Sequence, residues 1–188
     1  MTQQHLIKFI IREILFYLDN KTLINKCLGV NKALPNMMNI NLEERSFSFN
    51  GQLRATNNAS LVYTFFEVSD FLFPNEILFD VDIRVQSKDQ GWASAPVSSS
   101  WVEMKFINTS GETGLTVPLA SNYKEKTFKT TQLILSGHKN SKCDRKIFEN
   151  LSNRSNKVEI IARCQFPGWA FYVSLFQVFF RAIKVQRK

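Results

Sequence analysis

The stretch "EILFDVDIRV", Glu76–Val85, decides the fold class of this chain. Apolar and mostly polar side chains alternate along it, so every second residue faces the same side of an extended backbone. The apolar positions are Ile77, Phe79, Val81, Ile83 and Val85. This period of two predicts a β-strand with one face in a core and one face toward solvent. Asp80 and Asp82 lie on the polar face, where we expect ordinary solvated carboxylates.

The sequence after residue 45 contains further segments with strand-like composition. They are 61–68, 101–107, 130–136, 157–166 and 174–185. Loops rich in Gly, Ser, Asn and Pro separate them, and the polar residues 140–156 are expected to form a long loop. Many short strands without helices between them predict an antiparallel β-sandwich.

The first 45 residues follow a helical period instead. Apolar residues recur at spacings of three and four over 7–18, which predicts an amphipathic helix. A second short helix is expected over 21–30, and Pro35 limits any further helix. We therefore expect an α+β chain, with a short helical module at 1–45. An antiparallel β-sandwich of jelly-roll or galactose-binding-like topology is expected to follow at 46–188.

Length, charge and cysteine content narrow the class of protein. A chain of 188 residues suits one domain with a small appendage. Its net charge of +8 is dispersed, which indicates either a solvated basic surface or an acidic partner. The three cysteines form no CxxC pair, so we expect no zinc site and free thiols in a reducing compartment, cytoplasmic or nuclear. The N-terminal "HLIKFIIREILFYL" is too short and too charged to span a bilayer, so we expect no membrane partner.

The sequence shows no catalytic or cofactor motif. His5 and His138 are the only histidines, and no nucleophile elbow or Gly-rich phosphate loop occurs. We therefore expect neither an enzyme nor a bound cofactor or metal. We do not expect a nucleic-acid partner either, because the basic residues are not interleaved with aromatic residues on one strand face.

The N-terminal stretch "HLIKFIIREILFYLDNKTLINKCLGVNKAL", residues 5–34, resembles an F-box. The resemblance implies a substrate adaptor of an SCF-type ubiquitin ligase, with a Skp adaptor and cullin as partners and the sandwich holding a protein or glycan target. Ile7 and Ala33 depart from the proline and tryptophan that are usual in that family. The positions that would contact the Skp adaptor are Leu6, Ile10, Ile14, Leu15, Leu18, Leu23, Ile24 and Val30. From periodicity alone the helices would equally serve as a cap on a stand-alone ligand- or carbohydrate-binding module.

Two stretches near predicted loops hold all three tryptophans: "DQGWASAPVSSSW", 89–101, and "FPGWAFYV", 166–173. Such connections gather at the ends of an antiparallel sandwich, so we expect the tryptophans to meet at one end. There they would line a binding rim, where aromatic rings stack on a ligand, or they would plug the core. The two stretches also resemble motifs of largely uncharacterised fungal β-sandwich proteins. The expected ligand-binding residues are Asp89, Gln90, Trp92, Trp101, Glu103, Trp169 and Tyr172.

Overall fold

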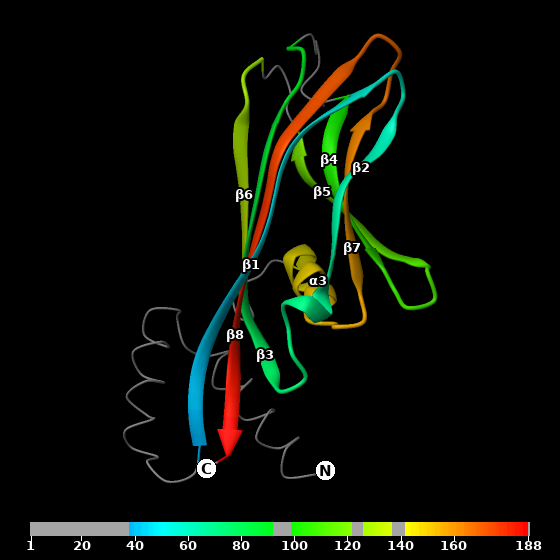
Figure 1. Ribbon diagram of the computed structural model, residues 1–188. Helices are drawn as coiled ribbons and strands as arrows, with labels where there is room; N and C mark the ends of the chain where they lie inside the picture. Colours follow the sequence, from blue (N-terminus) through cyan, green and yellow to red (C-terminus); the bar gives the residue numbers. More distant parts are fainter. Residues whose placement is uncertain (1–37, 92–98, 122–125, 137–141, 188) are drawn as a thin grey trace.

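Two four-stranded sheets packed face to face form the body of the molecule (Figure 1). The structure is a computed structural model, and it describes residues 38–91, 99–121, 126–136 and 142–187. The first sheet has the order β1-β8-β3-β6 and consists of β1 Met38–Thr56, β8 Ala170–Arg187, β3 Glu76–Lys88 and β6 Lys129–Ser136. The second sheet has the order β2-β7-β4-β5 and consists of β2 Ser60–Glu67, β7 Lys157–Cys164, β4 Ser100–Ile107 and β5 Thr113–Ser121. All neighbouring strands are antiparallel, so the predicted β-sandwich is confirmed.

The core lies between the inner faces of the two sheets. Alternate residues of each strand point into it, as period-two burial predicts. Phenylalanine rings from both sheets meet there: Phe66 stacks on Phe176 with ring centroids 6.1 Å apart, and Phe71 stacks on Phe180 at 5.2 Å. Such aromatic pairs contribute about 0.5–1.5 kcal/mol beyond the area that they bury.

The α+β fold class expected from the sequence is wrong, because the described chain is mostly β. β1 begins at Met38, inside the range 1–45 that the helical pattern assigned to a separate module. Residues 38–45 are extended because β8 runs on to Arg187 and pairs with them along its whole C-terminal half. A long-range strand partner of this kind overrides local helical tendency. Residues 1–37 lie outside the described part of the chain, and with them every predicted Skp-contacting residue.

The polar stretch 140–156, expected as a loop, contains the helix α3, Lys142–Leu151. Ile147 and Leu151 are buried in the core, and α3 contacts both β5 and β6. The helix therefore sits between edge strands of the two sheets, as Figure 1 shows. A short 3-10 turn, η1 Val68–Asp70, follows β2. Among the described residues, no helix has the length and apolar content needed to cross a membrane.

Asp80 and Asp82, expected to be solvated, are buried although they lie on the outer face of β3. Arg181 Nε lies 2.6 Å from Asp80 Oδ1, and Arg84 Nη2 lies 2.6 Å from Asp82 Oδ2. Gln132 also donates to both carboxylate oxygens of Asp82. Arg84 of the same strand and the longer side chains of the neighbouring strands, Arg181 and Gln132, cover these short carboxylates, and alternation alone could not indicate the contribution of the neighbouring strands.

Candidate functional site

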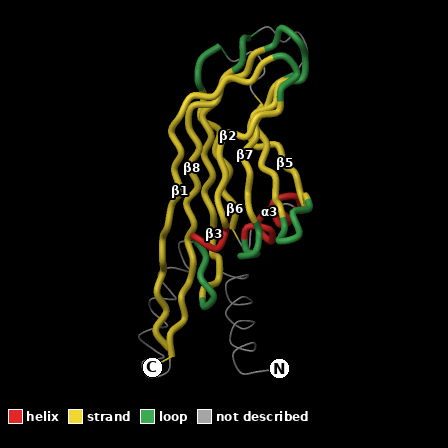
Figure 2. Tube along the Cα trace, turned by 45° about the vertical axis from the view of Figure 1, so that its right-hand side comes forward, coloured by secondary structure: helices red, strands yellow, loops and turns green. Residues whose placement is uncertain are grey.

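Three loops that the sequence places far apart meet at the upper end of the sandwich (Figure 2). Gln165 N donates to Ser99 O at 2.9 Å, which joins the loop after β7 to the loop before β4. Gly168 N donates to Asn57 Oδ1 at 3.1 Å, which adds the turn between β1 and β2. The two tryptophan-bearing stretches therefore approach each other at one end. Trp92 itself lies outside the described residues.

Asp89 and Gly91 shape the loop that follows β3, in which Gln90 is partly buried. The Oδ1 atom of buried Asp89 accepts a hydrogen bond from Gly91 N at 2.5 Å, an arrangement typical of a turn. Gly91 has φ +73°, and a Cβ atom there would collide with the side chain of Lys126. These residues fix the course of the loop, and Asp89 is too buried to present its carboxylate to a ligand.

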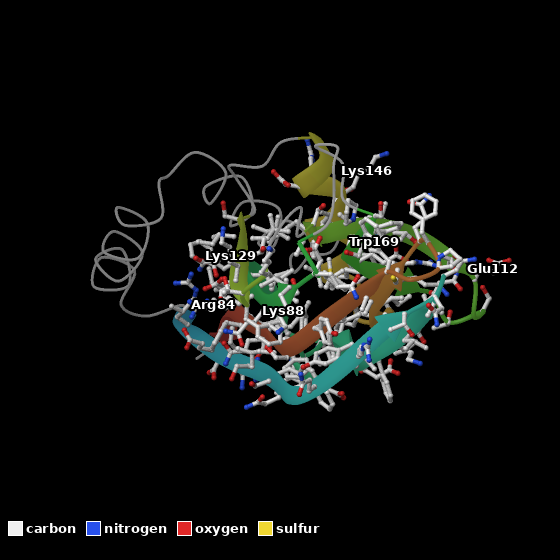
Figure 3. All side chains as sticks on the ribbon, turned by 90° about the horizontal axis from the view of Figure 1, so that it is seen from above. Arg84, Lys88, Glu112, Lys129, Lys146 and Trp169 are labelled. Atoms are coloured by element: carbon white, nitrogen blue, oxygen red, sulfur yellow. The ribbon has the colours of Figure 1, made fainter. Side chains whose placement is uncertain are left out.

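Trp169 belongs to the core rather than to an open rim. Its half-buried side chain packs against the buried cluster, and Figure 3, which looks down on this end, labels it there. The preceding turn depends on Gly168, which has φ +78°. Phe166, in the same turn, is 48% exposed.

Trp101 lies on the outer face of the second sheet and bonds to Glu103, which in turn pairs with Arg163. The adjacent Val102 points into the core, so the partly buried Trp101 side chain faces outward. Trp101 Nε1 donates to Glu103 Oε2 at 2.9 Å. Arg163, opposite Trp101 on β7, donates through Nε to Glu103 Oε1 at 2.8 Å, and its Nη2 lies 2.6 Å from the same oxygen. We call Trp101, Glu103 and Arg163 the Trp101 platform.

Farther along the outer face of the second sheet, paired charges lie among apolar side chains. Lys157 Nζ lies 3.0 Å from Glu159 Oε1 and 4.4 Å from the centroid of the Phe65 ring. Phe65 and Val62, on the edge strand β2, are 55% and 50% exposed. The outer face of the second sheet therefore carries the Trp101 platform at one end and the contact of Lys157 with Phe65 toward the other, with exposed Val62 between them.

Tyr172 faces away from the Trp101 platform, on the outer face of the first sheet. Its neighbours Phe171 and Val173 are completely buried, so alternation directs Tyr172 outward. The expected ligand-binding residues therefore do not line one pocket among the described residues. Trp101 and Glu103 lie together on one sheet, Tyr172 lies on the other, and Trp169 packs between them.

Sequence reasoning missed Arg163. The alternation in "KVEIIARC", 157–164, would have placed it on the polar face of a strand, but no local pattern pairs that strand with β4.

The strand that carries Arg163 ends at Cys164, which is buried and free, and burial raises the pKa of its thiol. Within the described ranges, no group of three or more His, Cys, Asp or Glu side chains is arranged to hold a metal ion.

No protein family and no curated protein sequence matches this chain. A solved structure of the Gx strain of infectious bursal disease virus matches with TM-score 0.43 and 6% identity over 78% of this chain. The chain spans 37% of that viral chain. The CBM22-1 xylan-binding domain of Paenibacillus barcinonensis Xyn10C matches with TM-score 0.38 and 14% identity, over 78% of this chain and 86% of that domain. Likenesses at this level do not bear on function.

Proposed function

We propose that this chain is a non-catalytic binding module that holds a glycan on the Trp101 platform. The observation that carries the proposal is the fixed, partly exposed indole on a sheet face, beside a carboxylate and a guanidinium. The apolar C–H face of a sugar ring stacks on an indole, while its hydroxyl groups need oriented donors and acceptors at the edge. Trp101 provides the stacking face and Arg163 provides donors at its edge, while the buried Glu103 holds both side chains in place.

The platform is organised before any ligand arrives. Glu103 is 6% exposed and accepts hydrogen bonds from Trp101 and Arg163, so both partners are held in one orientation. A ligand that meets an already ordered surface loses less affinity to the ordering of side chains. Arg163 remains partly exposed and keeps donors on its outer edge.

A protein target is the second candidate, because Phe65 and Val62 are exposed on the same face. Aromatic and arginine side chains are enriched at the centres of protein interfaces. A protein partner would cover Phe65 and Val62 together with the platform, whereas a short glycan would need only the platform. Phe65→Ser therefore separates the two candidates.

Binding to an array of immobilised glycans, followed by calorimetric titration of the strongest ligand, tests the proposal. We expect Trp101→Ala to weaken binding at least about tenfold, because a central aromatic anchor contributes about 2 kcal/mol or more. Tyr172→Ala, on the opposite face, is the matched control and should leave binding unchanged. The proposal fails if the wild type binds no glycan, or if Trp101→Ala binds as the wild type does.

A further inference from the structure

Cationic and aromatic side chains alternate in a row across the outer face of the first sheet. The register places Arg54 of β1 opposite Tyr172 of β8, and Tyr172 opposite Lys88 of β3. The Arg54 guanidinium lies 5.6 Å from the Tyr172 ring centroid, and Lys88 Nζ lies 5.0 Å from the same centroid. Lys88 Nζ also lies 4.7 Å from the centroid of the Phe128 ring. We call Arg54, Tyr172, Lys88 and Phe128 the cation–aromatic row.

The charges of this row are not neutralised by carboxylates of the described residues. Arg54 and Lys88 contact rings and form no ion pair there, in contrast to Arg84, which pairs with Asp82. Asp89 follows Lys88 in sequence, but it is buried and accepts from Gly91 N. Cations that are held by rings rather than by carboxylates remain able to attract an anion.

The outer face next to the row adds no negative charge among the described residues. The outward positions of the first sheet between Lys88 and Arg84 carry amides, hydroxyls and Leu175 but no carboxylate among the described residues. The chain as a whole has a net charge of +8, which favours anionic partners further.

We propose that the cation–aromatic row binds single-stranded nucleic acid. Proteins that hold single strands without reading their sequence use cations along the phosphates and aromatic rings against the bases. Four adjacent strands spaced by about 4.8 Å carry the row across about 14 Å, so rings and cations alternate on a scale that suits bases and phosphates. This site lies on the sheet opposite the Trp101 platform and does not depend on glycan binding.

The geometry also indicates how a base would enter the row. Arg54 is exposed and lies on the edge strand β1, so its guanidinium can swing away from Tyr172. A base can then stack on the Tyr172 ring, while the Arg54 guanidinium and Lys88 each meet a phosphate. Duplex DNA hides its bases inside the stack, so it can use only the charges of this surface.

Fluorescence anisotropy with a labelled twelve-nucleotide oligo-dT tests the proposal on the full chain. Two phosphate contacts, from Arg54 and Lys88, predict that log K falls with log salt with a slope of about −1.4. Lys88→Ala should reduce that slope by about 0.7, whereas Lys146→Ala, an exposed lysine of α3, removes the same charge elsewhere and should not. Tyr172→Leu should weaken binding at least about fivefold, and Tyr172→Phe should retain it because the ring is kept.

Three results would overturn the proposal. The first is no measurable binding of the wild type at low salt. The second is equal binding of oligo-dT, a duplex of the same length and heparin, with no effect of Tyr172→Leu, which would show a surface that only attracts polyanions. The third is a loss of oligo-dT binding in Trp101→Ala as large as that in Tyr172→Leu, which would show that binding is not confined to the cation–aromatic row. A melting curve of each variant shows whether it still folds, so that loss of folding is not mistaken for loss of binding. Arg54→Ala is a further variant, at an exposed position on an edge strand where the change should not disturb the fold.

Discussion

Two buried carboxylates on β3 show how single residues set the stability of this fold. Glu76 accepts two hydrogen bonds of 2.7 Å from Arg45, and Asp80 accepts one of 2.6 Å from Arg181. Burial alone would raise the pKa of Glu76, but hydrogen bonds from Arg45 and from the N–H of Phe73 bring it below its ordinary value. Burial raises the pKa of Asp80, and the charge of Arg181 offsets this only in part. The fold therefore favours the ionised form of Glu76 and disfavours that of Asp80.

We predict opposite pH dependences for Glu76→Gln and Asp80→Asn. At pH 7, Glu76→Gln should lower the free energy of unfolding by about 3 kcal/mol, because it breaks a buried, hydrogen-bonded ion pair. That loss should shrink as the pH falls through the lowered pKa of Glu76, where the wild type loses the same contribution. Asp80→Asn should cost about 1 kcal/mol or less at pH 7, because it also removes a buried charge.

The gap between the wild type and Asp80→Asn should widen in acid. Because the pKa of Asp80 is raised, the wild type gains stability as the pH falls through that pKa. The asparagine variant has no such group and does not gain stability there. Urea unfolding at pH 7, 5.5 and 4 measures both gaps. Two gaps that change in the same direction would contradict the assignment of the two carboxylates.

The two described tryptophans should respond differently to truncation. Trp169→Ala should destabilise the fold by about 3 kcal/mol, because it leaves a cavity at the end of the core. Trp101→Ala should cost about 1 kcal/mol, because the ring is on the outer face and Glu103 keeps Arg163 as a partner. Thermal unfolding compares the two variants. Equal losses would mean that Trp101 is a second plug.

At the scale of elements, period-two patterns predicted the strands whose faces differ in polarity. β3 and β4 extend close to their expected bounds, and β7 ends two residues earlier than expected, at Cys164. The sequence analysis did not predict β1 or β5, because long-range pairing rather than a clear local alternation defines them. It also missed α3, in whose described part Ile147 and Leu151 are buried and Phe148 packs against the core. These three apolar positions span little more than one helical turn, a pattern too short to separate a helix from a loop.

We predict that α3 is required for a stable sandwich. Leu151→Ala should lower the free energy of unfolding by about 2–5 kcal/mol, because Leu151 is completely buried and the sheets cannot close over the gap. Lys146→Ala, on the exposed side of the same helix, should change it by less than about 0.5 kcal/mol. Chemical denaturation of both variants measures the difference. A small loss for Leu151→Ala would show that α3 lies on the core without completing it.

At the scale of the whole molecule, the candidate sites arise from strand pairing that one sequence does not reveal. Trp101 and Glu103 share a strand, so their common face could be predicted, but Arg163 joins them only through the register of β4 with β7. The cation–aromatic row is still harder to predict from the sequence, since its members come from or adjoin four strands. Interleaving of basic and aromatic residues was absent along any one strand, yet it occurs across the sheet.

The long pairing of β1 with β8 leads us to a last prediction, which concerns the residue at which the folded unit begins. A chain that starts at residue 46 keeps the range 46–188 that the sequence predicted for the sandwich. It loses residues 38–45, and with them Arg45 and about half of the pairing between β1 and β8. Glu76 would then remain buried without its main partner. We expect a chain starting at residue 38 to unfold cooperatively, and one starting at 46 to be less stable by at least about 3 kcal/mol. Arg45→Met in the longer chain is the control, since it removes the ion pair and keeps the ladder. If both truncated chains melt at the same temperature, residues 38–45 add nothing to the fold, and the sandwich begins where the sequence pattern alone would place it.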